Sequence, residues 1–245
     1  MSKQPSAHAE QILTALKLVI ADFDQRPTHS VTGKGGKTFA FFPTSITDNI
    51  PPLQPALSDA VCLLSHLHLS HLDEATLGVG EEDRGAMIIS DILLYHRLPR
   101  TLARWTPTGA PGEIAVPLVN EYIQEQEQVK IFLNGVQSSD RIILIDDLVS
   151  TGGTMVALIQ AAQKTGAEIL EVFTIGEKAE NRGRDFVLKQ TGLSIKTLLV
   201  TDMEPRSEGL VSRVVACHLG NLDATSFEYV ASHFPPGFCR PGSGG

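Results

Sequence analysis

The sequence predicts an α/β fold in which a central parallel β-sheet is flanked by helices. Short apolar runs alternate along the chain with longer stretches of helical periodicity, which is the order found in parallel sheets. One of these runs, residues 142–145, is wholly aliphatic and suits a strand buried on both faces. The chain has 245 residues, of which 42% are hydrophobic, enough to enclose a sizeable core.

The N-terminal elements follow from their spacing. Residues 9–23 place apolar side chains on one helical stripe and predict a helix. The turn-rich segment 26–38 has the sequence TGKGGK at its centre, whose glycines and lysines resemble a phosphate site. No strand precedes it and no helix clearly follows, so a surface loop or hairpin is favoured. Residues 38–42 then predict a short aromatic strand before a loop.

The remaining elements alternate as a parallel sheet requires. In order, they are a helix at 57–69, a strand at 75–79, a helix reaching residue 95, a strand at 102–104, a Pro- and Gly-rich loop at 106–112, the strand at 142–145, a helix to residue 164, a strand at 168–175, a helix at 184–190 and a strand at 195–200. Gly166 predicts the C-terminal cap of the helix before it. The tail from residue 235 is predicted to be disordered.

The most informative stretch is IILIDDLVSTGGT, residues 142–154. A strand, a glycine-bearing turn and a helix form an anion cradle, because the first N–H groups of a helix are unpaired and its dipole favours negative charge there. Glycine lets the backbone approach a phosphate closely, and hydroxyl groups add donors. The cradle residues are Ser150, Thr151, Gly152, Gly153 and Thr154.

Two adjacent carboxylates, Asp146 and Asp147, precede this turn. They lie too close to a bound phosphate to serve as its ligands. They suit hydrogen bonds from sugar hydroxyls beside that phosphate, or the binding of a metal ion. A phosphate at one end and a diol at the other describe a phosphorylated ribose. The pattern G-x-x-x-x-G-K-[ST] is absent, which argues against a P-loop nucleotide site.

Residues 142–154 resemble the signature of the type I phosphoribosyltransferases, which bind 5-phosphoribosyl-1-pyrophosphate (PRPP). The resemblance implies a core sheet with a small hood subdomain. It also implies that Asp146 and Asp147 meet the ribose hydroxyls and that the following loop holds the 5-phosphate. Mg²⁺ is implied as a cofactor that arrives with PRPP, with Asp146 and Asp147 as candidate ligands, and a homodimer is expected.

Two further segments fit the pyrophosphate side of that family. Gly80 to Gly85 is a second strand–turn–helix, in which Glu82, Asp83, Arg84 and Gly85 match the Glu-x-Arg-Gly element of the adenine enzymes. Arg84 would supply charge and donors to the leaving pyrophosphate. Arg104 stands where the family places a basic residue that also contacts pyrophosphate. The residue after it is Trp105 in place of lysine, so Arg100 is a candidate replacement.

The closing loop and the base site match less well. Asn120-Glu121-Tyr122 resembles the loop of the adenine enzymes that closes over bound substrate and excludes water, which makes Glu121 a candidate catalytic residue. Phe41 and Phe42 are candidates for stacking on the base. Lys178 lies in a Glu-Lys element like that of the xanthine enzymes, and an ammonium, which only donates, favours an exocyclic oxo group.

Composition narrows the partners. The net charge of −8 argues against a nucleic-acid surface. No apolar run is long enough for a membrane span, and no signal segment is evident, so a soluble cytoplasmic protein is expected. Cys62, Cys217 and Cys239 are widely spaced and predict neither a disulfide framework nor a zinc site. In HLHLSHL, His66 and His68 would not share a helical face, which disfavours a metal site there.

The resemblance predicts a purine phosphoribosyltransferase that joins a free nucleobase to the phosphoribosyl group and releases pyrophosphate, with Asp147, Glu121 and Arg84 as catalytic residues. Two alternatives stay open: a related enzyme with a non-purine acceptor, and a PRPP-sensing regulator that does not turn the donor over. The expected division is a helix and hood segment at 1–37, a core at 38–205 and a C-terminal segment at 206–245.

Overall fold

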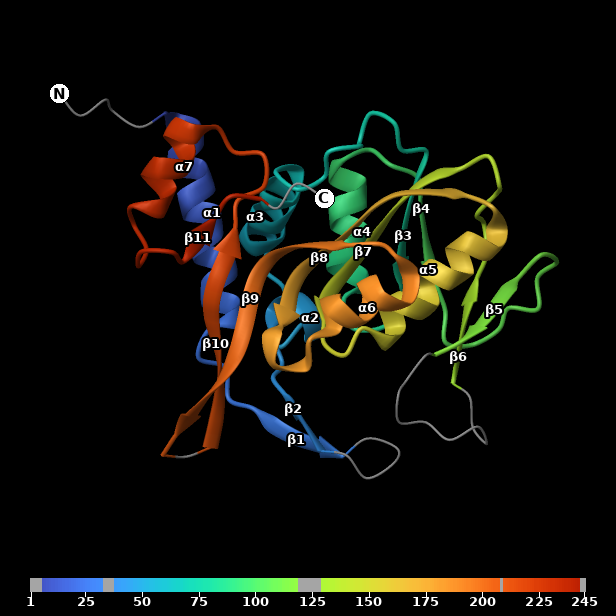
Figure 1. The fold of residues 1–245 in the computed structure, drawn as a ribbon, viewed down its shortest axis with the longest axis horizontal. Coiled ribbons are helices and arrows are strands. Elements are labelled where there is room, and N and C mark those ends of the chain that lie inside the picture. The colour runs from blue at the N-terminus through green and yellow to red at the C-terminus, as the bar shows by residue number, and fades with distance from the viewer. Residues whose placement is uncertain (1–5, 33–37, 119–128, 208, 243–245) are drawn as a thin grey trace.

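The computed structural model describes residues 6–32, 38–118, 129–207 and 209–242. Its centre is a seven-stranded sheet formed by β3 (Leu77–Glu81), β4 (Arg100–Ala103), β7 (Arg141–Val149), β8 (Glu168–Lys178), β9 (Ile195–Arg206), β10 (Gly209–His218) and β11 (Cys239–Arg240). Their order is β11-β10-β9-β8-β7-β3-β4 (Figure 1). The five strands from β9 to β4 are parallel, β10 is antiparallel to β9, and β11 is parallel to β10. The predicted α/β class is therefore confirmed.

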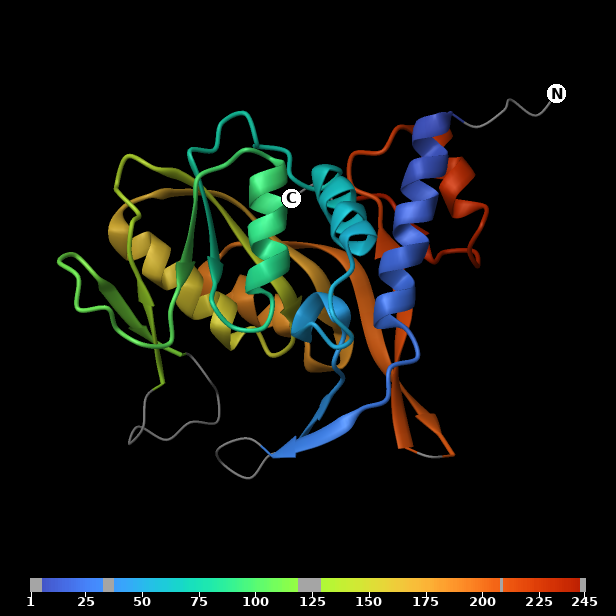
Figure 2. The ribbon, with the colours of Figure 1, turned by 180° about the vertical axis from the view of Figure 1, so that it is seen from behind.

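Helices cover both faces of this sheet. The helices are α1 (Ala7–Phe23), α2 (Ser45–Asp48), α3 (Pro55–His66), α4 (Ala86–Tyr95), α5 (Gly153–Thr165), α6 (Gly183–Thr191) and α7 (Ala224–Ala231), with a 3₁₀ turn at Ala179–Asn181. Figure 2 shows α1, α3 and α4 on one face, and Figure 1 shows α5 and α6 on the other. Two apolar cores result, one under each helical layer.

Strand β7 supplies side chains to both cores. Ile143 and Ile145 pack under α1, α3 and α4, whereas Ile142 and Leu144 pack under α5. All four side chains are fully buried. Burial on both faces explains why this strand reads as a continuous aliphatic run instead of an alternating one.

The strand continues beyond the predicted boundary. β7 was expected to end at Ile145, but it extends through Asp146 and Asp147 to Val149. Strand β3 likewise extends to Glu81, so Gly80 lies inside a strand and not in a turn. Pairing of Leu148 and Val149 with β8 stabilises the extension of β7, and pairing of Gly80 and Glu81 with β4 stabilises that of β3. Short polar residues at strand ends gave no sequence signal for either extension.

The hood is formed by a hairpin and a short helix. β1 (His29–Thr32) pairs antiparallel with β2 (Thr38–Phe41), in agreement with the predicted aromatic strand. Residues 33–37, most of the TGKGGK segment, lie outside the described residues. The expected loop after β2 contains α2, whose N-cap Thr44 accepts a hydrogen bond from the Thr47 N–H at 3.0 Å.

Several elements were missed by the sequence reasoning. β5 (Ile114–Pro117) and β6 (Lys130–Leu133) form an antiparallel pair beside the main sheet. β10, α7 and β11 follow the last predicted strand, so the chain after residue 235 includes a strand paired to β10. The expected boundary after residue 205 falls within β9. Across the described residues, no helix has the length and apolar character that a membrane span requires.

Candidate active site

The carboxyl ends of β3, β7 and β8 meet at one edge of the sheet, where parallel α/β folds bind ligands. A cavity of about 300 Å³ opens there. Its lining residues come from the hood, the three strand ends and the loop before α5. They are Ala40, Phe41, Thr47, Asp48, Glu81, Asp83, Arg84, Trp105, Asp146, Asp147, Leu148, Val149, Ser150, Thr151, Gly152, Gly153, Thr154, Met155 and Lys178.

The floor of this cavity is a cluster of carboxylates, which we call the acid cluster: Glu81, Asp146 and Asp147. Each is less than 9% exposed. Burial, and next the Asp147 charge, raises the pKa of Asp146 well above its usual value. Burial and the Glu81 charge raise the pKa of Asp147 to about 7. Burial and the Asp146 charge raise the pKa of Glu81 to about 8. The cluster is thus arranged to receive positive charge or hydroxyl donors.

The backbone geometry fixes the two aspartates. The Asp147 N–H donates to Asp146 Oδ1 at 2.9 Å, and the Leu148 N–H donates to Asp147 Oδ1 at 2.6 Å. Gly85 packs directly on Asp147, because a Cβ atom at this glycine would stand 2.6 Å from the Asp147 Cβ. The loop after β3 therefore approaches β7 closely only with glycine at this position.

The loop from Ser150 to Thr154 leads into the N-terminus of α5. Gly152 has φ +84°, and a Cβ atom there would lie 2.7 Å from the Gly183 carbonyl oxygen. Asn181 donates from Nδ2 to Ser150 Oγ at 3.0 Å. This geometry aims the first N–H groups of a thirteen-residue helix at the cavity. Such groups bind anions, which is the role that the sequence predicted for this loop.

The loop after β3 divides its side chains between two environments. Asp83 and Arg84 line the cavity. The Arg84 guanidinium lies 4.3 Å from the Phe41 ring centroid, and its Nε is 3.5 Å from Asp48 Oδ1. Glu82 lies outside the cavity and pairs with Arg104, with Oε2 3.4 Å from Nε. The structure therefore brings Arg84 to the cavity and directs Glu82 and Arg104 toward each other.

Trp105 stands in place of the lysine that the family resemblance leads us to expect after Arg104. Its indole N–H donates to Glu81 Oε2 at 2.8 Å, and its backbone N–H donates to Glu82 Oε1 at 2.8 Å. A neutral donor here holds the Glu81 carboxylate against the wall of the cavity. Sequence reasoning missed Glu81 because the extra acid precedes the matched Glu-x-Arg-Gly element.

The opposite wall faces the hood. Lys178 is 6% exposed, its Nζ donates to the Ala40 carbonyl at 2.9 Å, and burial lowers its pKa. Asp48 and Thr47 line the same wall, and no sequence motif indicated them. Phe41 lines the cavity, whereas Phe42 is fully buried in the core, with its ring 6.3 Å from that of Phe23. Glu121 and Tyr122 lie outside the described residues.

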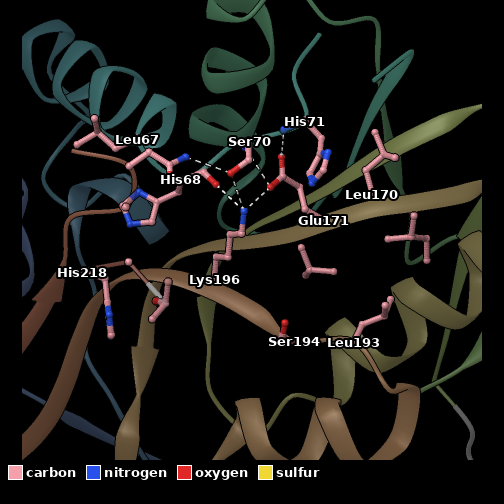
Figure 3. Close-up of a pocket in the computed structure, with 16 residues that line it drawn as sticks. Leu67, His68, Ser70, His71, Leu170, Glu171, Leu193, Ser194, Lys196 and His218 are labelled. Carbon is pink, nitrogen blue, oxygen red and sulfur yellow. Dashed lines mark hydrogen bonds and ion pairs between the residues drawn. The ribbon is translucent and has the colours of Figure 1, made fainter. Parts of the chain in front are cut away.

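A second cavity lies at the opposite, amino edge of the sheet (Figure 3). Its volume is about 410 Å³, and its charged groups are already paired. Lys196 Nζ donates to Glu171 Oε2 at 2.7 Å, and the Ser70 and His71 N–H groups donate to the same carboxylate. His68 packs against Phe173, with ring centroids 5.2 Å apart. None of the motif residues lines this cavity.

The three histidines of HLHLSHL have separate partners. His66 stacks on His96, His68 packs on Phe173, and His71 pairs with Glu74. No group of three or more His, Cys, Asp or Glu side chains in the described part of the chain has the geometry of a metal cage.

The fold and the site together are those of the type I phosphoribosyltransferase class, and both the similar sequences and the similar solved structures agree. No protein-family model matches the chain. It is 34% identical over 167 residues to a hypoxanthine/guanine phosphoribosyltransferase of Methanocaldococcus infernus. The match covers 67% of this chain and 86% of the relative. The enzyme of the same name from Methanocaldococcus jannaschii is 33% identical over 165 residues, with the same two shares. The chain belongs to the type I purine phosphoribosyltransferase family.

Solved structures support the same fold. The adenine phosphoribosyltransferase of Trypanosoma brucei superposes with a TM-score of 0.55 at 21% identity, over 82% of this chain and 81% of that one. The Saccharomyces cerevisiae enzyme gives a TM-score of 0.57 at 18% identity, over 77% and 98%. Because the chain belongs to this family, the protein is an enzyme that transfers 5-phosphoribosyl from PRPP to a purine base and releases pyrophosphate.

Proposed function

We propose that the acceptor is a 6-oxopurine, such as hypoxanthine or guanine. The observation behind this proposal is Lys178, whose buried ammonium lines the cavity on the hood side. An ammonium donates and never accepts, so it suits the exocyclic oxygen of these bases and opposes the amino group of adenine. Asp48, on the same wall, would accept from a ring N–H or a 2-amino group. The named activity of the archaeal relatives is consistent with this acceptor.

The donor half would use the residues that the motif predicts. In this proposal the loop Ser150–Thr154 and the N-terminus of α5 hold the 5-phosphate. Asp146 and Asp147 accept hydrogen bonds from the ribose hydroxyls, and Arg84 neutralises the pyrophosphate as it leaves. Arg84 would have to exchange its present contacts with Asp48 and Phe41 for the pyrophosphate oxygens. Glu121 remains the candidate for a closing loop.

Mg²⁺ fits this site as a partner of the donor. Buried carboxylates with raised pKa values are hard oxygen ligands that lack a balancing cation, and Mg²⁺ prefers one or two carboxylates together with substrate phosphates. Asp146 and Asp147 would hold it. When bound, the ion would offset negative charge on the pyrophosphate.

Three further proposals concern the assembly, its place in the cell and the division of the chain. A homodimer is supported by Met87, Leu94 and Tyr95, exposed side chains of α4 that line a groove with Leu53. Light scattering should give twice the chain mass of 26.4 kDa, and Leu94→Glu should give the monomer. The cytoplasmic location and the division at residues 37 and 205 also remain proposals, open to fractionation and limited proteolysis.

The deciding experiment measures pyrophosphate release with PRPP, Mg²⁺ and each base in turn. Hypoxanthine, guanine and xanthine are compared with adenine at equal concentration. We expect kcat/KM for at least one 6-oxopurine to exceed that for adenine by roughly 100-fold, because a donor facing an amino group leaves a buried polar pair unsatisfied. A preference for adenine would refute the role given to Lys178.

A further inference from the structure

Two cysteines far apart in sequence are neighbours at the edge of the sheet. β10 and β11 pair in parallel with Cys217 opposite Cys239. The Cys217 thiol donates to the Cys239 sulfur, and the two Sγ atoms are 3.3 Å apart. The strands are held in this register by hydrogen bonds from the Cys217 N–H to the Phe238 carbonyl and from the Leu219 N–H to the Arg240 carbonyl. Directly opposed residues of paired strands present their side chains on the same face.

The two thiols differ chemically. The donated S–H stabilises a thiolate on Cys239 and lowers its pKa. The same contact, followed by burial, raises the pKa of Cys217. Cys239 is partly exposed, whereas Cys217 is fully buried. Cys239 is therefore the nucleophile that a small oxidant meets first, and Cys217 is the thiol positioned to resolve the product.

We propose that Cys217 and Cys239 form a reversible disulfide that locks β11 onto β10. In the first step the Cys239 thiolate attacks one sulfur of a low-molecular-weight disulfide such as oxidised glutathione, and one glutathione leaves as thiolate. Cys217 then attacks the Cys239 sulfur and expels the second glutathione, whose thiolate takes up the proton that Cys217 loses. Two protein thiols are oxidised and one glutathione disulfide is reduced to two thiols. Excess reduced glutathione reverses both steps.

The surroundings allow the small movement that bond formation requires. The sulfur atoms must approach by about 1.3 Å from their present 3.3 Å to reach bonding distance. β11 has only two residues and pairs on one side, so it is the easiest strand of the sheet to shift. Gly237 precedes it with φ +80°, and a Cβ atom at this glycine would meet nothing within 4 Å. The third cysteine, Cys62, is buried in α3, where burial raises its pKa to about 12.

The bond would act on the stability of the C-terminal segment and not on catalysis. It would close a loop that contains α7 and the stacked pair Phe234 and Phe238, which is partly buried and packs against the core under α1 and α3. β11 lies four strands from β7, about 19 Å across the sheet at the usual strand spacing. The oxidised protein should therefore retain its basal activity. Because disulfides are rare in reducing compartments, the bond would report a change of redox conditions.

The test uses the full chain equilibrated with glutathione buffers from fully reduced to fully oxidised. Thiol titration under denaturing conditions should fall from three thiols to one, since the chain has three cysteines and one bond consumes two. Peptide mapping without reduction should link residues 217 and 239, with the mass of two hydrogen atoms lost. The melting temperature should rise by roughly 5–10 °C. Reduction should reverse all three changes.

Cysteine variants distinguish a disulfide between Cys217 and Cys239 from other oxidation of the thiols. Cys62→Ser should keep the full shift in melting temperature, whereas Cys217→Ser and Cys239→Ser should abolish it. Where a serine variant folds poorly, peptide mapping of the parent chain still shows whether the disulfide forms. Three free thiols after full oxidation would refute the proposal. So would a bond to Cys62, a bond between two chains, or a glutathione that stays attached to Cys239, since each shows that Cys217 does not resolve the intermediate.

Discussion

The two cavities at opposite edges of the sheet differ in how their charges are balanced. At the amino edge, Glu171 accepts from Lys196 and from two backbone N–H groups (Figure 3). At the carboxyl edge, none of the acid cluster pairs with a lysine or arginine among the described residues, and all three pKa values are raised. A stable fold tolerates uncompensated buried charge only at a cost. The comparison indicates that the carboxyl edge is organised for a ligand and the amino edge for stability.

The strongest test of this comparison is Asp147→Asn. The substitution removes one charge from the acid cluster and keeps the shape of the side chain. If the carboxylate holds the donor in the transition state, kcat/KM for PRPP should fall roughly 100- to 1,000-fold. Asp202→Asn is a matched control, because Asp202 also accepts from the next N–H of its strand but is exposed. Steady-state kinetics that gave equal values for the two variants would contradict the ribose assignment.

The amino edge should respond in the opposite way. Glu171→Gln leaves the Lys196 ammonium without its charge partner and should lower the free energy of unfolding by about 3 kcal/mol. The kcat/KM of the folded fraction should stay within about twofold of the parent, because the cavity lies at the far end of the strands. Glu168→Gln, which breaks an exposed pair with Arg141, is the control and should leave urea unfolding unchanged. A selective loss of activity in Glu171→Gln would mean that the amino edge takes part in function.

Sequence reasoning recovered the two halves of the active cavity unequally. The donor side was predictable because Asp146 to Thr154 are contiguous, and the chemistry of a strand, a glycine turn and a helix start is local. The hood side is assembled from β2, α2 and β8, so Asp48 and Lys178 meet only after the sheet forms. Phe42 illustrates the limit, since alternation along an extended segment sends Phe41 to the cavity and Phe42 to the core.

The positions at which the strands end were also predicted wrongly, and for a related reason. Asp146 and Glu81 lie inside strands although carboxylates are poor strand formers, because pairing with neighbouring strands outweighs local preference. The elements after residue 200 gave weak signals, since β10 is an edge-region strand with a mixture of polar and apolar residues. The function was therefore easier to predict from the sequence than the extent and order of the strands.

A smaller effect is expected on the hood wall. Lys178→Met keeps the length of the side chain and removes its ammonium. Loss of one charged hydrogen bond to the base should raise KM for a 6-oxopurine roughly 30-fold, or about 2 kcal/mol, with little change in KM for PRPP. Lys189→Met, at an exposed lysine of α6, serves as the control. A rise in KM for PRPP instead would move Lys178 to the donor side.

The smallest expected effect is on the pH dependence of stability in the absence of substrate. This measurement tests both cavities together. Glu81 has its pKa raised from 4.5 to about 8 by burial and by Asp146, so the native state holds its proton more tightly than the unfolded chain. Its contribution to stability is present below about pH 4.5 and is lost as pH rises toward 8. His68 has its pKa lowered from 6.5 to about 4 by burial, so the native state holds its proton more weakly. Its contribution is present above pH 6.5 and is lost as pH falls toward 4.

Each of these two pH-dependent contributions to stability can be removed by a single substitution. Urea unfolding of Glu81→Gln, which retains an oxygen to accept from the Trp105 indole, should lose the decline above pH 5, an effect on the order of 1–2 kcal/mol. His68→Asn should lose the decline below pH 6.5 by a similar or smaller amount. The slope of stability against pH is the readout, because a general loss of packing shifts the whole curve without changing its shape. Parallel curves for Glu81→Gln and the parent would mean that Glu81 is not protonated in the free enzyme. The carboxyl edge would then have its charge balanced by solvent, and the contrast between the two cavities would rest on geometry alone.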